Sequence, residues 1–361
     1  MKATRANSIV DKNLPSIPAG RLQGHEGPVH VIRFTTDGKY CLSAGNDRTV
    51  RLWNPTKLDP ACTASGQRRS QLLSNAKSLE TKSIPVDALP NCLPIQTYSN
   101  GHSHPVHAIS INDPSTNLLS SSDRTLVLTD VITTKALRRF HGHSSRINSV
   151  AFASKQNNDV YLSASYDSTV KIWDGRNHNS REPIQTLSEA KDSVTSILMD
   201  EENGSCEIIT AGVDGIVRTY DLRKGVIRND DVGEPITNMS FSKDRNCLLL
   251  NGLDGILRFV ERDSGELLNS YTGGHIAGKY GLDCAILAMD DCVMTGSEDG
   301  KVILYDLVDR HVVQSLEGHT RPTCSIAAHP KRDHSSVVIS ASFDSNAVVW
   351  TNVDELNKWE Y

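Results

Sequence analysis

The sequence predicts an all-β fold made of similar repeats, and three observations support this prediction. Along the 361 residues, a small or hydroxyl residue followed by a tight turn that carries an aspartate returns seven times. Six positions after each aspartate comes a residue that is usually large or aromatic, often with an acidic residue behind it. All intervals between the aspartates except the first are 40 to 47 residues long. The aspartates are Asp47, Asp123, Asp167, Asp214, Asp254, Asp299 and Asp344.

A period of about 40–45 residues, with Gly-His ahead of the turn and Trp-Asp behind it, is typical of a β-propeller blade. The repeats cover nearly the whole chain, so one closed ring is expected rather than several domains. The predicted fold is therefore a seven-bladed β-propeller over residues 18–353, between an N-terminal tail at 1–17 and a C-terminal tail at 354–361.

Each repeat should form four short antiparallel strands, and the third repeat shows the pattern. Residues 147–152 read as its innermost strand, followed by strands at 161–165 and 169–173 and an outer strand at 183–187. β-branched and aromatic residues dominate the inner runs, and turn residues separate them. The runs are apolar rather than alternating, because both faces of a central strand are buried between neighbouring blades.

The two ends of the chain are expected to close the ring. The last repeat stops after its third strand, at 347–350, and residues 20–23 ahead of the first Gly-His have the register of an outer strand. We expect these two segments to pair, which removes the exposed sheet edges that promote aggregation.

The first interval is longer than the others because of an insertion at residues 58–92, which is rich in Ser, Ala, Gln and Lys. Such an insertion is tolerated as a mobile surface loop. Leu72, Ala76 and Leu79 also fit one face of a short helix, so a segment that orders on binding a partner is the alternative.

Composition restricts the class of protein. The net charge is −5 and the pI about 6.2, which argues against binding nucleic acid by bulk charge. The eight cysteines include no Cys-x-x-Cys pair, so reduced thiols are expected. No long apolar run or N-terminal signal is present, and we expect a soluble intracellular protein without membrane contact.

The recurring polar residues are interpreted as buried hydrogen-bonded tetrads, in which an aspartate, a histidine, a hydroxyl and an aromatic residue contact one another in sequence. A His-Ser-Asp set can also be mistaken for a nucleophilic triad, but repetition at the blade period favours a structural role. No catalytic residue, cofactor site or metal site is predicted, and the protein is not expected to be an enzyme. The predicted tetrads are His25, Ser43, Asp47 and Trp53; His143, Ser163, Asp167 and Trp173; His275, Thr295, Asp299 and Tyr305; and His319, Ser340, Asp344 and Trp350.

Three repeats depart from this pattern. The second has Thr129 where an aromatic residue is expected, and the fifth has Val260 there and Leu250 at the hydroxyl position. The fourth and fifth also lack the Gly-His dipeptide. These blades should depend more on packing against their neighbours, because a lost buried hydrogen bond costs about 0.5–1.5 kcal/mol.

The residue before each turn aspartate should point toward the narrow face of the ring. Tyr166, Val213 and Leu253 hold this place in consecutive repeats, and Phe343 holds it in the last. Exposed apolar clusters of this kind mark protein interfaces. Arg146 and Arg321, in loops that lead to innermost strands, should add positive charge to the same face, which is the predicted partner-binding site.

Arg176 and Arg223 stand two residues after the terminal acid of successive repeats, in Trp-Asp-Gly-Arg and Tyr-Asp-Leu-Arg. This placement resembles the motif by which propeller receptors dock onto the adaptor of cullin-RING ubiquitin ligases. Local salt bridges are the simpler interpretation of both arginines.

Several stretches resemble one family of WD-repeat proteins, the mitogen-activated protein kinase organizer family, also described as WD repeat-containing protein 83. The resemblance runs from about residue 18 to 350 and includes the degenerate repeats. Its most specific stretches are residues 34–42, 52–55, 187–192, 213–223, 263–268 and 297–302.

The resemblance implies a non-enzymatic scaffold for proteins, one that assembles components of a MAP kinase cascade and associates with the spliceosome in pre-mRNA splicing. Its partners would be signalling kinases or their adaptors and spliceosomal proteins, bound by a monomer within larger assemblies. The expected localisation is cytoplasmic and nuclear. No direct nucleic-acid binding is expected. A substrate receptor of a cullin-RING ubiquitin ligase is the alternative function.

Overall fold

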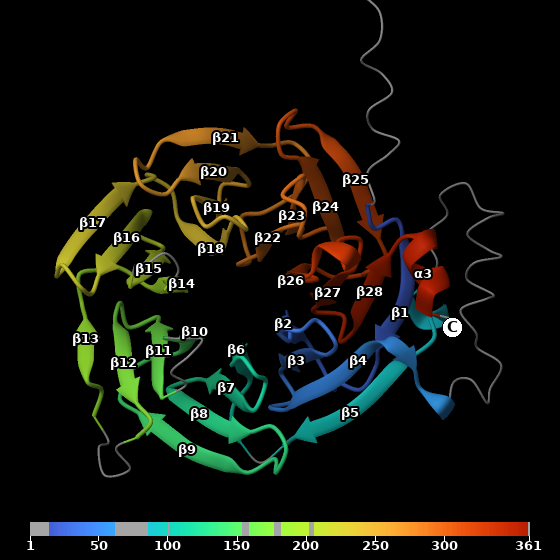
Figure 1. Cartoon of the computed structure of the whole chain (residues 1–361), viewed down its shortest axis with the longest axis horizontal. Helices are drawn as coiled ribbons and strands as arrows, with labels where there is room; N and C mark the ends of the chain where they lie inside the picture. Colours follow the sequence, from blue (N-terminus) through green and yellow to red (C-terminus); the bar gives the residue numbers. More distant parts are fainter. Residues whose placement is uncertain are drawn as a thin grey trace, which may run out of the picture.

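The computed structural model describes residues 14–61, 86–99, 101–153, 159–176, 182–201 and 206–359. Their strands form seven four-stranded antiparallel sheets, arranged as blades around a central channel (Figure 1). The predicted seven-bladed propeller is thereby confirmed.

In blades one to six the strands run outward from the channel in chain order, and in blade seven β1 takes the outermost place beside the last strand of the chain. Blades one to three contain β2 (Val29–Phe34), β3 (Cys41–Gly45), β4 (Val50–Leu58) and β5 (Cys92–Tyr98); β6 (Val106–Ile111), β7 (Asn117–Ser122), β8 (Thr125–Asp130) and β9 (Ala136–His141); and β10 (Ile147–Phe152), β11 (Val160–Ser165), β12 (Val170–Asp174) and β13 (Gln185–Leu187).

Blades four to seven contain β14 (Val194–Asp200), β15 (Glu207–Gly212), β16 (Ile216–Asp221) and β17 (Val226–Asp231); β18 (Ile236–Phe241), β19 (Cys247–Gly252), β20 (Leu257–Glu261) and β21 (Leu267–Tyr271); β22 (Cys284–Ile286), β23 (Cys292–Gly296), β24 (Lys301–Asp306) and β25 (Val312–Glu317); and β26 (Thr323–Ala328), β27 (Val338–Ser342) and β28 (Ala347–Thr351) with the N-terminal β1 (Ile17–Leu22).

Ring closure takes the predicted form. β1 lies antiparallel to β28 and completes blade seven, with Leu22 opposite Ala347 (Figure 1). The strand begins three residues earlier than residue 20, and the register shifts between Pro18 and Gly20. Ala19 and Leu22 are fully buried, so the N-terminal strand contributes apolar packing as well as backbone hydrogen bonds.

The end of the insertion reinforces this closure, which the sequence did not predict. The short 3-10 helix η1 (Val86–Ala88) precedes the fully buried Leu89. The Arg21 guanidinium on β1 donates to Asp87 at 3.1 Å and to Asn91 at 2.8 Å. The helix predicted around Leu72, Ala76 and Leu79 lies outside the described residues.

The C-terminal segment is a packed helix, which corrects the prediction of a tail from residue 354. Helix α3 (Val353–Trp359) buries Leu356 against the core shared by blades seven and one. The Glu355 side chain is also buried, and it accepts hydrogen bonds from His334, from Lys358 Nζ at 2.8 Å and from Trp359 Nε1 at 3.2 Å. Helix α3 therefore packs against the propeller through one buried leucine and one fully paired carboxylate, although most of its residues are polar.

Side chains on the inner strands link several blades to their neighbours. In six of the seven described inner strands the pairing register shifts after the first residue, as a β-bulge does. Asn148 at such a bulge donates to the Val194 carbonyl of the next blade at 2.8 Å, and Thr195 donates to Ile236 at 2.7 Å. These contacts tie neighbouring blades together around the channel.

Candidate partner-binding surfaces

Three blades contain the complete buried tetrad. In blade three, Trp173 Nε1 donates to Ser163 Oγ at 2.8 Å, and Ser163 Oγ lies 2.8 Å from His143 Nε2. Since the indole is only a donor, the serine hydroxyl gives its own proton to the histidine, and the histidine Nδ1–H donates to Asp167 at 2.9 Å. Blades one and seven repeat this chain with His25, Ser43, Asp47 and Trp53 and with His319, Ser340, Asp344 and Trp350.

The electrostatics of the tetrads keep the aspartate charged, and in blade three burial favours the neutral form of the histidine. Burial by itself would raise the pKa of Asp167, but hydrogen bonds from Thr169 and His143 outweigh it and lower the pKa to about 2. Asp47 likewise has its pKa lowered to about 2 against burial, by His25 and Thr49. Burial lowers the pKa of His143 despite the neighbouring carboxylate. Every polar atom of the set is engaged, so no nucleophile is presented to solvent.

Blade six does not form the predicted tetrad. His275 Nδ1 contacts the Tyr305 hydroxyl at 2.8 Å, whereas Thr295 donates instead to the carbonyl of Asp283 at 3.2 Å. Asp299 accepts from the Lys301 backbone N–H, and the second ring nitrogen of His275, Nε2, is buried without a hydrogen-bond partner. A tyrosine hydroxyl reaches the ring nitrogen directly, so the intermediate serine or threonine is bypassed.

In blades four and five an arginine replaces the missing histidine. Asp214 accepts two hydrogen bonds from Arg218, at 3.2 and 2.7 Å, and Asp254 accepts two from Arg258, at 3.2 and 2.6 Å. Both arginines follow their aspartate by four residues, which is the signal that could have identified them in the sequence. A bidentate arginine compensates the turn carboxylate where no imidazole is available.

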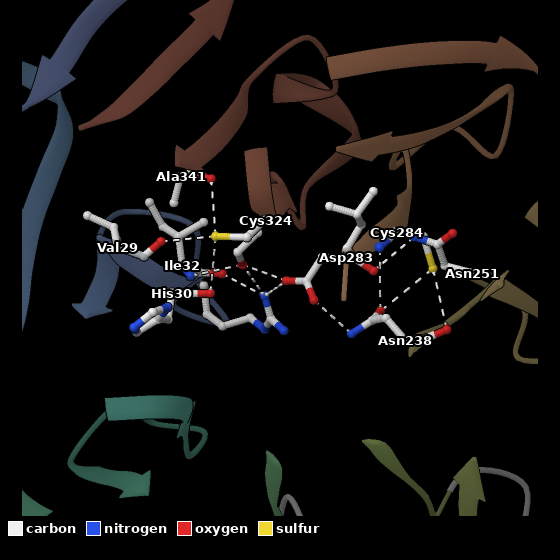
Figure 2. Close-up of polar contacts among 12 residues, drawn as sticks. Val29, His30, Ile32, Asn238, Asn251, Asp283, Cys284, Cys324 and Ala341 are labelled. Atoms are coloured by element: carbon white, nitrogen blue, oxygen red, sulfur yellow. Dashed lines mark hydrogen bonds and ion pairs between the residues drawn. The ribbon is translucent and has the colours of Figure 1, made fainter. Parts of the chain in front are cut away.

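A polar network lines one side of the channel and joins the inner strands of four blades (Figure 2). Asp283, beside β22, accepts from Arg33 of β2 at 2.8 Å, from Ser325 of β26 at 2.5 Å and from Asn238 of β18 at 2.9 Å. Cys324 of β26 donates to the Val29 carbonyl at 3.0 Å. The carboxylate is fully compensated, so this network links blades and is not a site with a free reactive group.

The narrow face is defined here as the face that carries the turns after the second strand of each blade and the loops before the inner strands. The backbone N–H groups of the residues before the turn aspartates fix these turns: Tyr166 donates to the Arg146 carbonyl at 2.8 Å, and Val213 and Leu253 make equivalent bonds. Tyr166 is 58 % exposed and Val213 37 %, whereas Leu253 is half-buried. Three neighbouring blades therefore present apolar side chains from fixed turns.

A second group of aromatic residues lies on the same face near blades seven and one. Phe343 is half-buried, with its ring 5.2 Å from that of Tyr280 and 5.7 Å from that of His30. The His30 ring lies 4.9 Å from His107 of the next blade. Burial, the neighbouring His30 and the positive charge of Arg146 lower the pKa of His107 to about 3. These rings are neutral at physiological pH and extend the apolar surface toward the channel.

Ile276 and Tyr280, in the loop between β21 and β22, were missed by the sequence reasoning although both are exposed. This loop departs from the repeat, so no periodic position marked them. Of the predicted arginines, Arg146 is exposed and its Nε donates to Asn148 at 3.1 Å, and Arg321 is also exposed.

Arg176 and Arg223 follow β12 and β16, at turns on the face opposite the narrow face. Both are exposed. The Arg176 guanidinium donates to Asp174 of its own turn, at 3.1 Å through Nε and 3.2 Å through Nη2. The structure thus shows for Arg176 the local ion pair that the simpler interpretation requires.

Within the described part of the chain, no group of three or more His, Cys, Asp or Glu side chains could hold a metal ion. None of the helices described is long and apolar enough to cross a membrane. The seven cysteines among the described residues are all free, and most are buried.

The repeats match the family model described as WD domain, G-beta repeat, over residues 16–54, 92–130, 134–174 and 310–351. The fold and these matches define a WD-repeat β-propeller, a class that generally serves as a non-enzymatic interaction scaffold.

Similarity to known proteins is more specific. The chain is 37% identical to WD repeat domain-containing protein 83 of Rattus norvegicus over 326 residues, covering 90% of this chain and 89% of that protein. It is 37% identical to the Homo sapiens protein of that name over 319 residues, covering 88% of each, and 26% identical to a Dictyostelium discoideum homolog over 359 residues, covering 91% of this chain and 96% of that one. The chain belongs to the WD repeat domain-containing protein 83 family.

Proposed function

We propose that this protein is a non-enzymatic scaffold that binds proteins on its narrow face and assembles components of a MAP kinase cascade. Following the family resemblance, we further propose that it associates with the spliceosome in pre-mRNA splicing, and acts in both cytoplasm and nucleus. Its partners are signalling kinases or their adaptors and spliceosomal proteins, bound by a monomer.

One observation carries the proposal: apolar side chains are held out to solvent by hydrogen-bonded turns in neighbouring blades. Tyr166 is the most exposed of them, and its backbone is fixed to the loop before β10. A rigid aromatic side chain loses little conformational entropy on binding, so it is well suited to anchor a partner. Binding two partners on separate surfaces raises their effective concentration toward each other, which is the physical basis of a scaffold.

The test is affinity purification with mass spectrometry on the intact protein and on a Tyr166→Ala, Leu253→Ala double variant. We expect the variant to lose a subset of partners at an unchanged thermal midpoint. The matched control is Ile132→Ala with Val308→Ala, which removes exposed apolar side chains from turns on the opposite face. Identical partner lists for the intact protein and the Tyr166 variant would reject the narrow-face site.

A substrate receptor of a cullin-RING ubiquitin ligase is the second candidate. The observation in its favour is that Arg176 and Arg223 are both exposed at equivalent turns of neighbouring blades. If it is correct, an Arg176→Ala, Arg223→Ala variant loses the ligase adaptor from pull-downs while narrow-face partners remain. Failure of the intact protein to recover the adaptor eliminates this function.

A further inference from the structure

A cavity of about 250 Å³ lies between blades four and five. Its floor is apolar and buried, made by Val217 of β16, Leu248 and Leu250 of β19 and Val260 of β20. Exposed residues at its mouth, among them Asp231, open it to solvent. An apolar cavity of about 150 Å³ is large enough to hold benzene, so this one can accept an aromatic ring.

The cavity occupies the place that a tryptophan side chain fills in other blades. Val260 pairs with Leu248 as Trp173 pairs with Tyr161 and Trp350 with Val338. Leu250 replaces the serine hydroxyl that receives the indole N–H in those blades. Val232 stands four residues before β18, as His143 stands four before β10, and it too lines the cavity. Substitution at three tetrad positions has therefore removed both the ring and its polar partners.

Other blades without tryptophan have filled the equivalent space. In blade two, where Thr129 holds the position, Tyr98 of the preceding blade packs there and its hydroxyl donates to the Val131 carbonyl at 3.0 Å. The space left is only about 10 Å³. Blades four and six place Tyr220 and Tyr305 at the position. Blade five has no replacement.

Two polar features indicate what the cavity binds. The Arg262 side chain is 9 % exposed and lines the cavity, and its Nε–H is buried without a hydrogen-bond partner, although its terminal nitrogens are paired with Asp200 and Glu207. A buried donor without an acceptor is destabilising, and an oxygen of a bound group would supply the missing acceptor. Asp231 and Glu261 place negative charge around the opening, whereas Asp230, which also lines it, is paired with Arg228 at 3.3 Å.

We propose that this cavity binds the side chain of a tyrosine carried by a basic peptide segment of a partner protein. The ring replaces the missing indole, the phenol oxygen accepts from Arg262, and the acidic mouth attracts flanking lysines or arginines. A phenol suits the site because its oxygen also has a proton to donate to a carboxylate. This site is independent of the narrow face, so its failure leaves the proposed function untouched.

The test measures binding of tyramine, a phenol with a cationic tail, to the full chain by titration in NMR. We expect saturable binding with a Kd of roughly 1 mM, as is usual for so small a ligand. Phenethylamine, which lacks the hydroxyl, and 3-(4-hydroxyphenyl)propionate, which carries the opposite charge, should each bind several-fold more weakly. Equal binding of all three, or none by tyramine, overturns the proposal.

Two variants locate the site. Val260→Trp fills the cavity from within and should abolish tyramine binding. Asp231→Lys with Glu261→Lys reverses the charge of exposed residues at the mouth, and should reverse the preference between tyramine and the anionic phenol. The matched control, Asp263→Lys with Glu266→Lys, changes exposed acids nearby that do not line the cavity. If the Asp231→Lys, Glu261→Lys variant still prefers tyramine over the anionic phenol, tyramine does not bind in this cavity and the proposal is rejected, whether or not Val260→Trp folds.

Discussion

At the scale of single residues, the repeated histidine, serine and aspartate side chains stabilise the fold by forming hydrogen bonds with one another. Ser163 is fully buried and has two partners, the Trp173 indole and the His143 ring. Removing the serine hydroxyl leaves the indole N–H and the histidine ring nitrogen unpaired. The free-energy cost of a buried unpaired group is larger than the net stabilisation that one hydrogen bond contributes.

We therefore expect Ser163→Ala to lower the free energy of unfolding by about 1–3 kcal/mol, because a buried donor loses its acceptor. Urea denaturation followed by tryptophan fluorescence measures it. Ser144→Ala is the matched control, since that side chain is exposed and its hydroxyl makes only a 3.5 Å contact. Equal effects of the two substitutions would contradict the role assigned to the tetrad.

Buried histidines also make stability depend on pH. Burial and the charge of Arg139 lower the pKa of His102 to about 4, from an ordinary value of 6.5. The native state thus favours the neutral ring. The stability this contributes is present above pH 6.5 and is lost as the pH falls from 6.5 toward 4. We expect the fall of the thermal midpoint over that range to be shallower in His102→Gln, and an unchanged slope would count against the assignment.

At the scale of the blade, the space at the tryptophan position is occupied in different ways. Blades one, three and seven have tryptophan there, Tyr98 of blade one occupies the space in blade two, and blade five has a cavity at Val260. Sequence alone revealed the missing side chains but not their replacements, because Tyr98 belongs to the outer strand of another blade. The arginines that pair with Asp214 and Asp254 were likewise present in the sequence but outside the four-residue pattern.

This difference predicts opposite effects for the same substitution. Val260→Trp should raise the free energy of unfolding by about 0.5–2 kcal/mol, because it fills an existing cavity. Thr129→Trp should lower it by about 1–3 kcal/mol, because Tyr98 already occupies that space. Thermal and urea unfolding of the two variants side by side measures both. Destabilisation by the first would show that the cavity does not match an indole.

At the scale of the whole molecule, the ring is sealed by segments from three distant parts of the sequence: β1, η1, and β28 with the helix α3 that follows it. The sequence predicted the pairing of β1 with β28, because a three-stranded last repeat requires a fourth strand from elsewhere. It did not predict that η1 and α3 pack beside this junction. Their apolar residues are few and isolated, so neither shows a repeat or a helical stripe.

Deleting residues 1–22 should lower the thermal midpoint by at least about 5 °C, because the buried Leu22 and the β28 pairing are lost. The exposed edge of β28 should also promote aggregation. Deleting residues 1–13 is the control, since β1 then remains. An equal midpoint for the two truncations would exclude closure by the N-terminal strand.

The central claim is that recurring polar residues hold the ring together, whereas apolar side chains on its narrow face recognise partners. One comparison tests it: thermal midpoint and partner recovery, measured together at a temperature where both variants are folded, for Ser163→Ala and for Tyr166→Ala, Leu253→Ala. The account predicts that the first loses stability and keeps its partners, while the second keeps its stability and loses partners. The opposite result, with partners lost only when the buried serine is removed, would contradict it.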